Sequence, residues 1–143
     1  FFNKTTDPGL SVVLDGICAE AKTTDGASTV IGFWDELPPG LVQWHCRQRD
    51  VPPAQLPQAP NRVGLDFYTP DFDAFLAEDS LRTIFVAHYK TDPPQPYLMH
   101  YRNKWLLPLE DKLAADPRFF KAQEFGTDSP WYRVSVYRRL ARR

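Results

Sequence analysis

Polar side chains gather where the predicted strands end, and these residues are the best suited to chemistry. Ligands of an open parallel sheet sit outside the carboxyl ends of its strands. The residues expected at those ends are Asp35, Glu36, Tyr68, His88, Tyr89 and Lys90. This set could hold an acid/base pair, with His88 the residue best able to shuttle protons near neutral pH. The ordinary alternative is that strand ends are polar wherever they meet water.

The stretch TVIGFWDELPPGLVQWH, residues 29–45, has the order of strand, turn and helix that often holds a nucleotide. A phosphate site at such a turn needs glycines and free backbone N–H groups. Here Asp35 and Glu36 repel phosphate. Pro38 and Pro39 lack N–H donors, and a single glycine follows them. We therefore expect no binding of NAD, ATP or S-adenosylmethionine, and no cofactor is predicted.

The histidines and cysteines do not form a metal-binding motif. His45, His88 and His100 are far apart in sequence and lack a close-spaced ligand pair, so no metal site is predicted. Cys18 and Cys46 both fall on predicted helices, where a small buried thiol is the ordinary role. A disulfide between them requires Cα atoms within about 7 Å, which their positions in the sequence do not establish. Both states of the cysteines stay open.

Hydrophobic periodicity and turn signals divide the chain into alternating helices and strands. Asp71 is expected to cap one short helix. The expected helices cover residues 10–22, 41–49, 72–76 and 106–114, and the expected strands cover residues 29–34, 62–68, 81–88, 119–125 and 131–139. The last two strands flank the turn GTDSP and are expected to form a hairpin.

Alternating helices and strands favour parallel strands joined by right-handed crossovers, with helices on both faces of the sheet. We therefore predict an α/β fold: a three-layer Rossmann-like sandwich with a mostly parallel sheet of about five strands and a C-terminal antiparallel hairpin. Its central strands are expected to bury Ile31, Phe33, Ile84, Phe85 and Val86.

Composition fits one domain over residues 1–143. The chain is 43% hydrophobic, enough for a core of its own. Its formal charge of -1 gives no general attraction to nucleic acid. No apolar run approaches the roughly 18 to 20 residues that cross a bilayer. Because the sequence starts Phe1-Phe2 and its one methionine is Met99, we expect it to be excised from a longer protein.

The tail YRRLARR concentrates basic side chains at the end of the chain. A solvated, partly frayed end is the ordinary interpretation. The functional alternative is contact with anionic lipid head groups, worth on the order of 1 kcal/mol per basic residue. The residues concerned are Arg138, Arg139, Arg142 and Arg143.

Three stretches carry a family resemblance: TVIGFWDELPPGLVQWHCRQRDVP, FDAFLAEDSLRTIFVAH and FFKAQEFGTDSPWYRVSVYRR. Together with the preceding helix they resemble the soluble C-terminal domain of polytopic membrane glycosyltransferases of the protein mannosyltransferase and aminoarabinose transferase-like group. In that group a strand often runs into a turn and a helix with an aromatic, as at Trp44, and the chain ends in the pattern yR-x-x-v-y-R-R. The similarity spans nearly the whole chain through loose patterns.

The resemblance implies a non-catalytic domain. Enzymes of this group transfer sugar from polyprenyl-phosphate donors, and their catalytic acidic residues lie on a loop absent from this chain, so no catalytic residue is predicted here. The domain would lie on the periplasmic or extracytoplasmic side of the cell membrane, covering the active site or contacting acceptor. Its partners would be the rest of the parent protein and, within it, the polyprenyl-phosphate-sugar or acceptor. Such a location favours a Cys18–Cys46 disulfide.

Two alternatives remain. One is a stand-alone enzyme with a degenerate Rossmann-like fold, related to methyltransferases, although the missing glycine-rich turn argues against it. The other is a protein-binding adaptor that uses the aromatic residues Tyr97, Tyr101 and Trp105.

Overall fold

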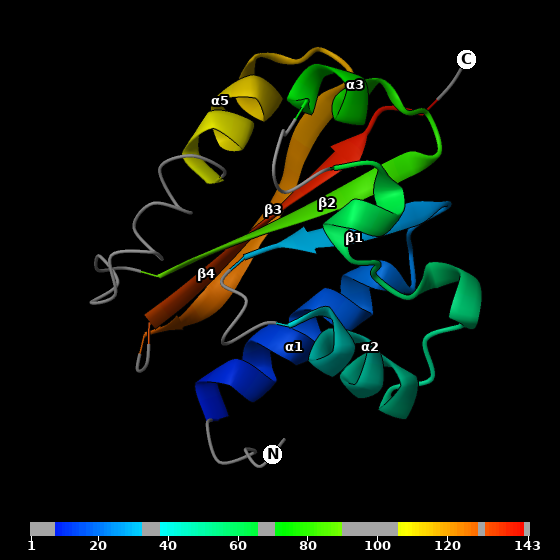
Figure 1. Ribbon diagram of the computed structural model, residues 1–143. Helices are drawn as coiled ribbons and strands as arrows, with labels where there is room; N and C mark the ends of the chain where they lie inside the picture. The colour runs from blue at the N-terminus through cyan, green and yellow to red at the C-terminus, as the bar shows by residue number, and fades with distance from the viewer. Residues whose placement is uncertain (1–7, 33–37, 66–70, 90–105, 129–130, 142–143) are drawn as a thin grey trace.

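One mixed β-sheet with helices on both faces organises the chain (Figure 1). The computed structural model describes residues 8–32, 38–65, 71–89, 106–128 and 131–141. Its helices and strands are α1 (Pro8–Ala21), β1 (Ala27–Ile31), α2 (Pro39–Gln48), α3 (Phe72–Ala77), β2 (Leu81–Tyr89), α5 (Leu107–Ala115), β3 (Phe119–Asp128) and β4 (Trp131–Arg139). Two short 3-10 helices, η2 (Pro53–Gln55) and η3 (Pro60–Val63), lie between α2 and α3.

Within the described residues the sheet has four strands in the order β1-β2-β4-β3. Among these strands, only β1 and β2 are parallel neighbours, with Thr29 opposite Ile84. β4 is antiparallel to both β2 and β3. β3 therefore runs in the same direction as β2, but β4 lies between them. The hairpin strand fills the place that a parallel neighbour of β2 would take, as in a split βαβ unit.

The predicted Rossmann-like sandwich with about five mostly parallel strands is wrong. Alternating helices and strands indicate the direction of successive strands, but they do not determine which strands become neighbours. Here the C-terminal hairpin, which was predicted as an edge feature, inserts β4 into the interior of the sheet. Two of the three neighbouring pairs are antiparallel as a result.

The strand predicted over residues 62–68 is also wrong for the part that the structure describes. Residues 60–63 form η3, which begins at Pro60 and is followed by Gly64 as its C-cap. Gly64 has a φ of 101°, a left-handed backbone conformation that ends the helix. Residues with a Cβ atom rarely adopt this conformation, whereas glycine does so easily. Apolar Val63 and Leu65 gave this turn the alternation of a strand. Residues 66–70 lie outside the described residues.

The other predicted elements have counterparts in the structure. Asp71 caps α3 by accepting a hydrogen bond from the Ala74 N–H at 3.0 Å. The strand predicted over residues 81–88 is β2, and the predicted hairpin is formed by β3 and β4. Residues 33 and 34 of the first predicted strand lie outside the described residues.

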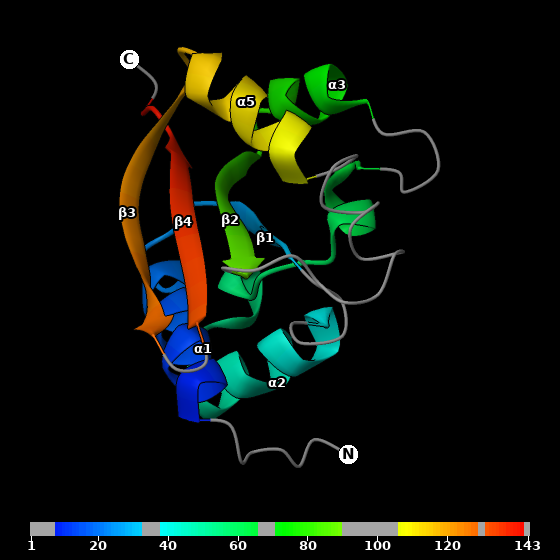
Figure 2. The same cartoon turned by 90° about the vertical axis from the view of Figure 1, so that its left-hand side faces the viewer.

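Two apolar cores lie on opposite faces of the sheet. Figure 2 shows the helices that cover these faces, with α1 and α2 on one side and α3 and α5 on the other. Alternation along β2 sends Phe85 to the core beneath α1 and α2, and Ile84 and Val86 to the core beneath α3 and α5. Ile31 belongs to the second core. These four predicted core residues are fully buried, whereas Phe33 lies outside the described residues.

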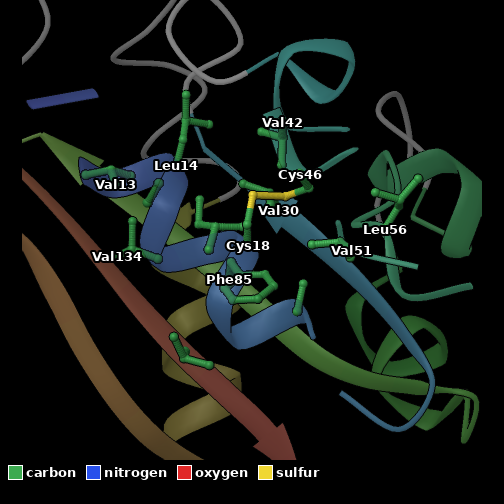
Figure 3. Close-up of a cluster of buried hydrophobic side chains, with 14 residues drawn as sticks. Val13, Leu14, Cys18, Val30, Val42, Cys46, Val51, Leu56, Phe85 and Val134 are labelled. Carbon is green, nitrogen blue, oxygen red and sulfur yellow. A yellow bond between two sulfur atoms is a disulfide. The ribbon is translucent and has the colours of Figure 1, made fainter. Parts of the chain in front are cut away.

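A disulfide joins the two helices of the first core. Cys18 of α1 and Cys46 of α2 are bonded, with their Cα atoms 5.1 Å apart. Figure 3 shows the bond among the buried side chains Val30, Val42 and Val51. Of the two states that the sequence left open, the structure contains the disulfide.

Candidate functional site

A cluster of polar side chains forms where β2, β4 and α5 meet. His88 lies near the end of β2 on the face covered by α3 and α5, because it alternates in phase with Ile84 and Val86. Its Nε2 atom is 2.7 Å from Oε1 of Glu110 in α5. The Tyr137 hydroxyl of β4 donates to Oε2 of the same carboxylate at 3.3 Å. One carboxylate therefore links a helix to two neighbouring strands.

The surroundings hold the carboxylate charged and the phenol neutral. Burial works to raise the pKa of Glu110, but hydrogen bonding and charge at His88 outweigh it, with help from Tyr137 and Lys121, and the pKa is lowered. Burial, together with the charge of Glu110, raises the pKa of Tyr137 to about 12. The site thus pairs a neutral hydroxyl donor with an ionised acceptor at neutral pH.

The imidazole of His88 is not fully satisfied by this arrangement. Its Nε2 atom is buried, and its short contact with Oε1 of Glu110 is poorly aligned for a hydrogen bond. The part of the chain that the structure describes offers Nε2 no better partner. A buried polar atom without an aligned partner calls for a water, a ligand or a rearrangement. The cluster is therefore the strongest candidate in the described residues for binding a polar group or transferring a proton.

The predicted strand-end set is only partly described. The His88 side chain is in the cluster, and the backbone of Tyr89 completes β2. The remaining four predicted residues, Asp35, Glu36, Tyr68 and Lys90, lie outside the described residues. The structure thus leaves their grouping around His88 as a prediction.

Sequence reasoning missed Glu110 and Tyr137. Glu110 directly follows the core residue Leu109 in α5, a position that reads as a solvated helix face. Tyr137 stands in a strand of mixed character, with Arg138 and Arg139 after it. Tyr137 comes near His88 through the pairing of β2 with β4, and Glu110 does so because α5 packs over the same face. No local signal reveals either arrangement.

A second imidazole–carboxylate pair connects α1 to α2. Nε2 of the buried His45 is 2.6 Å from Oδ1 of Asp15. The Arg49 Nε donates to the same oxygen at 3.0 Å. His45 is adjacent to Cys46 in the sequence, and Asp15 lies one helical turn before Cys18, so this pair supports the same junction as the disulfide. Its geometry fits a structural contact between helices.

An open cleft of about 600 Å³ lies at the other end of the sheet, near the starts of β1 and β2. Its lining includes the apolar Val63 and Phe75 and the charged Arg62 and Glu78. Ser80 donates to Glu78 through both its N–H and its hydroxyl. These bonds lower the pKa of Glu78. The Glu78 carboxylate is thus already hydrogen-bonded to its neighbour Ser80. Among the described residues, the cleft has no arrangement suited to catalysis.

Two of the four tail arginines have partners inside the domain. Arg138 donates to the Glu20 carboxylate at 2.6 Å. The buried Arg139 donates to the carbonyls of Leu76 and Leu81 at 2.6 and 2.8 Å. The other two, Arg142 and Arg143, lie outside the described residues. Lipid contact by this tail remains a prediction, and it now depends on the last two residues.

Within residues 8–32, 38–65, 71–89, 106–128 and 131–141, no three His, Cys, Asp or Glu side chains are grouped so that they could hold a metal ion. A search of the same segments found no helix long and apolar enough to cross a bilayer. No protein-family model matches the chain, and no curated protein or solved structure matches it significantly.

Proposed function

We propose that this chain is an extracytoplasmic, non-catalytic domain of a polytopic membrane glycosyltransferase that uses a polyprenyl-phosphate sugar donor. The resemblance of its three sequence stretches to that group is the starting point. The observation that carries the extracytoplasmic location is the Cys18–Cys46 disulfide. Structural disulfides persist in oxidising compartments and are rare where thiols are kept reduced.

Burial of the disulfide supports a permanent structural role in that compartment. Cys18 and Cys46 are at most 1% exposed and are surrounded by apolar side chains. A reductant or a redox enzyme has little access to such a bond, whereas redox-sensing cysteines are exposed and reactive. A buried structural disulfide of this kind fits a domain that folds outside the cytoplasm.

In this proposal the cluster of His88, Glu110 and Tyr137 contacts acceptor through His88 and Glu110, whose side chains are 18% and 23% exposed. Sugar and polypeptide acceptors present hydroxyl and amide groups, which hydrogen-bond to carboxylates, imidazoles and phenols. In this proposal the cluster positions acceptor, and the chemical step belongs to the membrane-embedded part of the parent protein.

The rival explanations receive less support. The alternative of a stand-alone enzyme assumed a Rossmann-like parallel sheet. The sheet is instead mixed and has β4 between β2 and β3. The aromatic residues of the adaptor alternative, Tyr97, Tyr101 and Trp105, lie outside the described residues, and no observation in the described part favours that alternative.

The test uses the parent reading frame. We expect several apolar segments of about 20 residues before this domain. We also expect transfer of sugar from a polyprenyl-phosphate donor, and protection of the domain from thiol-modifying reagents until it is reduced.

His88→Gln and Glu110→Gln should raise the KM for acceptor and leave kcat largely unchanged. A reading frame without apolar segments would defeat the proposal, as would a collapse of kcat with KM unchanged in both variants.

A further inference from the structure

The two edge strands of the sheet, β1 and β3, differ in whether another segment hydrogen-bonds to their outer side. The edge at β1 is covered, because the Gln58 N–H donates to the Ser28 carbonyl at 2.8 Å and the Thr29 hydroxyl donates to the Gln58 carbonyl at 2.8 Å. At the opposite edge, β3 pairs with β4 alone among the described residues. An uncovered edge strand offers backbone donors and acceptors to another strand.

A β-bulge in β3 decides which of its side chains share a face. The register shifts between Lys121 and Gln123, so the strand carries one extra residue. Phe120 lies opposite Arg138, and Phe125 lies opposite Val134. Positions 134 and 138 of β4 are on one face, because side chains alternate along a strand. Phe120 and Phe125 therefore face the same way, which five residues of regular strand would not allow.

The charged pair of β3 is brought into phase in the same way. Lys121 lies opposite Tyr137, and Glu124 lies opposite Ser135, so both point to the other face of the sheet. Their charged atoms are 3.4 Å apart, and about half of each side chain is exposed. Phe120 is also 44% exposed. One face of the edge thus carries two aromatic side chains, with Phe120 exposed and Phe125 packed against the core beneath α1, and the other face carries the charged pair.

We propose that β3 pairs antiparallel with β3 of a second copy of this chain, about a two-fold axis at Ala122 and Gln123. In that register Lys121 lies opposite Glu124 of the partner subunit, and Phe120 lies opposite Phe125 of the partner subunit. Each pair occurs twice by symmetry and joins side chains on the same face, as strand pairing requires. The continuous sheet would have eight strands.

Charge complementarity selects this register and this occupant. Moving the partner strand by two residues removes both Lys–Glu oppositions, so the charges favour one alignment over its neighbours. Bulges and edge lysines usually discourage strand pairing. Here the same bulge brings the aromatic and charged pairs into phase, and the lysine meets a carboxylate. Because the β1 edge is covered, pairing closes at a dimer and does not continue into a fibre.

Sedimentation velocity from low micromolar to near-millimolar concentration tests the proposal on the whole chain. The wild-type protein should shift from monomer to dimer. Lys121→Glu and Glu124→Lys each place like charges opposite one another twice, which should weaken dimerisation on the order of tenfold or more. Lys22→Glu is the matched control, because it makes the same charge change at the exposed end of α1, and it should dimerise like the wild type.

Two further experiments, a charge-exchanged double variant and a mixture of the single variants, test this strand register specifically. The double variant Lys121→Glu/Glu124→Lys exchanges the charges and should recover the dimer. A mixture of the two single variants should form a heterodimer, because each supplies the charges that the other needs. Circular dichroism of every variant should match the wild type, as expected for exposed positions. A wild-type protein that stays monomeric overturns the proposal. So does a dimer that forms equally well in the single variants, or one that neither the double variant nor the mixture restores.

Discussion

The Tyr137 hydroxyl donates a hydrogen bond to Oε2 of Glu110 at 3.3 Å and so ties the sheet to α5. This contact joins two groups whose pKa values move in opposite directions, with that of Tyr137 raised to about 12 and that of Glu110 lowered. Both shifts favour the neutral phenol beside the ionised carboxylate, and each has a measurable consequence.

The raised pKa of Tyr137 predicts a loss of stability at alkaline pH. The group titrates at about 12 in the folded protein and near 10 when unfolded. Its contribution is therefore fully present below pH 10 and is lost as the pH rises toward 12. Phenolate absorbance should show one of the six tyrosines titrating late, and Tyr137→Phe should remove that step. If all late-titrating absorbance survives in Tyr137→Phe, the assignment is wrong.

The lowered pKa of Glu110 predicts the opposite behaviour in acid. Its contribution is present above the ordinary value of 4.5 and is lost as the pH falls through the lower folded-state pKa. At neutral pH, Glu110→Gln should lower the free energy of unfolding by about 1 to 3 kcal/mol, because His88 and Tyr137 lose a charged acceptor. This deficit should shrink at acidic pH. Asp111→Asn, at the neighbouring exposed position of α5, is the control and should cost much less.

Local parts of this fold were predictable because local chemistry determines them. The Asp71 cap, the apolar run of β2 and the pairing of β3 with β4 as a hairpin each depend on residues close together in the sequence. η3 shows the limit, since Val63 and Leu65 imitate a strand while Pro60 and Gly64 impose a tight turn. A short alternation of two apolar residues is too weak to outweigh that backbone chemistry.

The candidate site depends on pairing that no local pattern reveals. His88 was predicted because an imidazole at a strand end is suited to proton transfer. Glu110 and Tyr137 reach it only because β4 lies beside β2 and α5 packs over the same face. The same order of helices and strands is compatible with a mostly parallel sheet and with a sheet in which β4 lies between β2 and β3. Long-range packing decides between the two sheets.

The disulfide should make a large contribution to stability. Cys18 and Cys46 are separated by 28 residues, and closing a loop of that length removes unfolded-state entropy equivalent to about 3 to 4 kcal/mol. Cys18→Ala/Cys46→Ala should lose about that amount in urea denaturation. In the same denaturation a reductant reaches the bond once the chain unfolds, so it should destabilise the wild-type protein similarly and leave the double variant unchanged. An equal effect of the reductant on both proteins would show that it acts elsewhere.

The central strand β2 should be sensitive to truncation of its side chains. Ile84 is fully buried in the core beneath α3 and α5. Ile84→Ala should therefore lower the free energy of unfolding by about 2 to 5 kcal/mol, through lost burial and a residual cavity. Val12→Ala on α1 is the control, because Val12 is 51% exposed and its truncation should cost under about 0.5 kcal/mol. Similar losses in the two variants would contradict the burial assigned to Ile84.

The end of α2 offers a test of backbone conformation. Asp50 has φ of 63°, and the N–H groups of Asp50 and Val51 donate to the carbonyls of Arg47 and Cys46, as in a Schellman motif. Glycine adopts this left-handed conformation without the Cβ clash. Asp50→Gly and Asp50→Ala remove the same charge, so comparing them isolates the backbone effect. Asp50→Gly should be the more stable by about 1 kcal/mol in urea denaturation. If Asp50→Ala is equally stable, the turn does not hold this residue in the left-handed region.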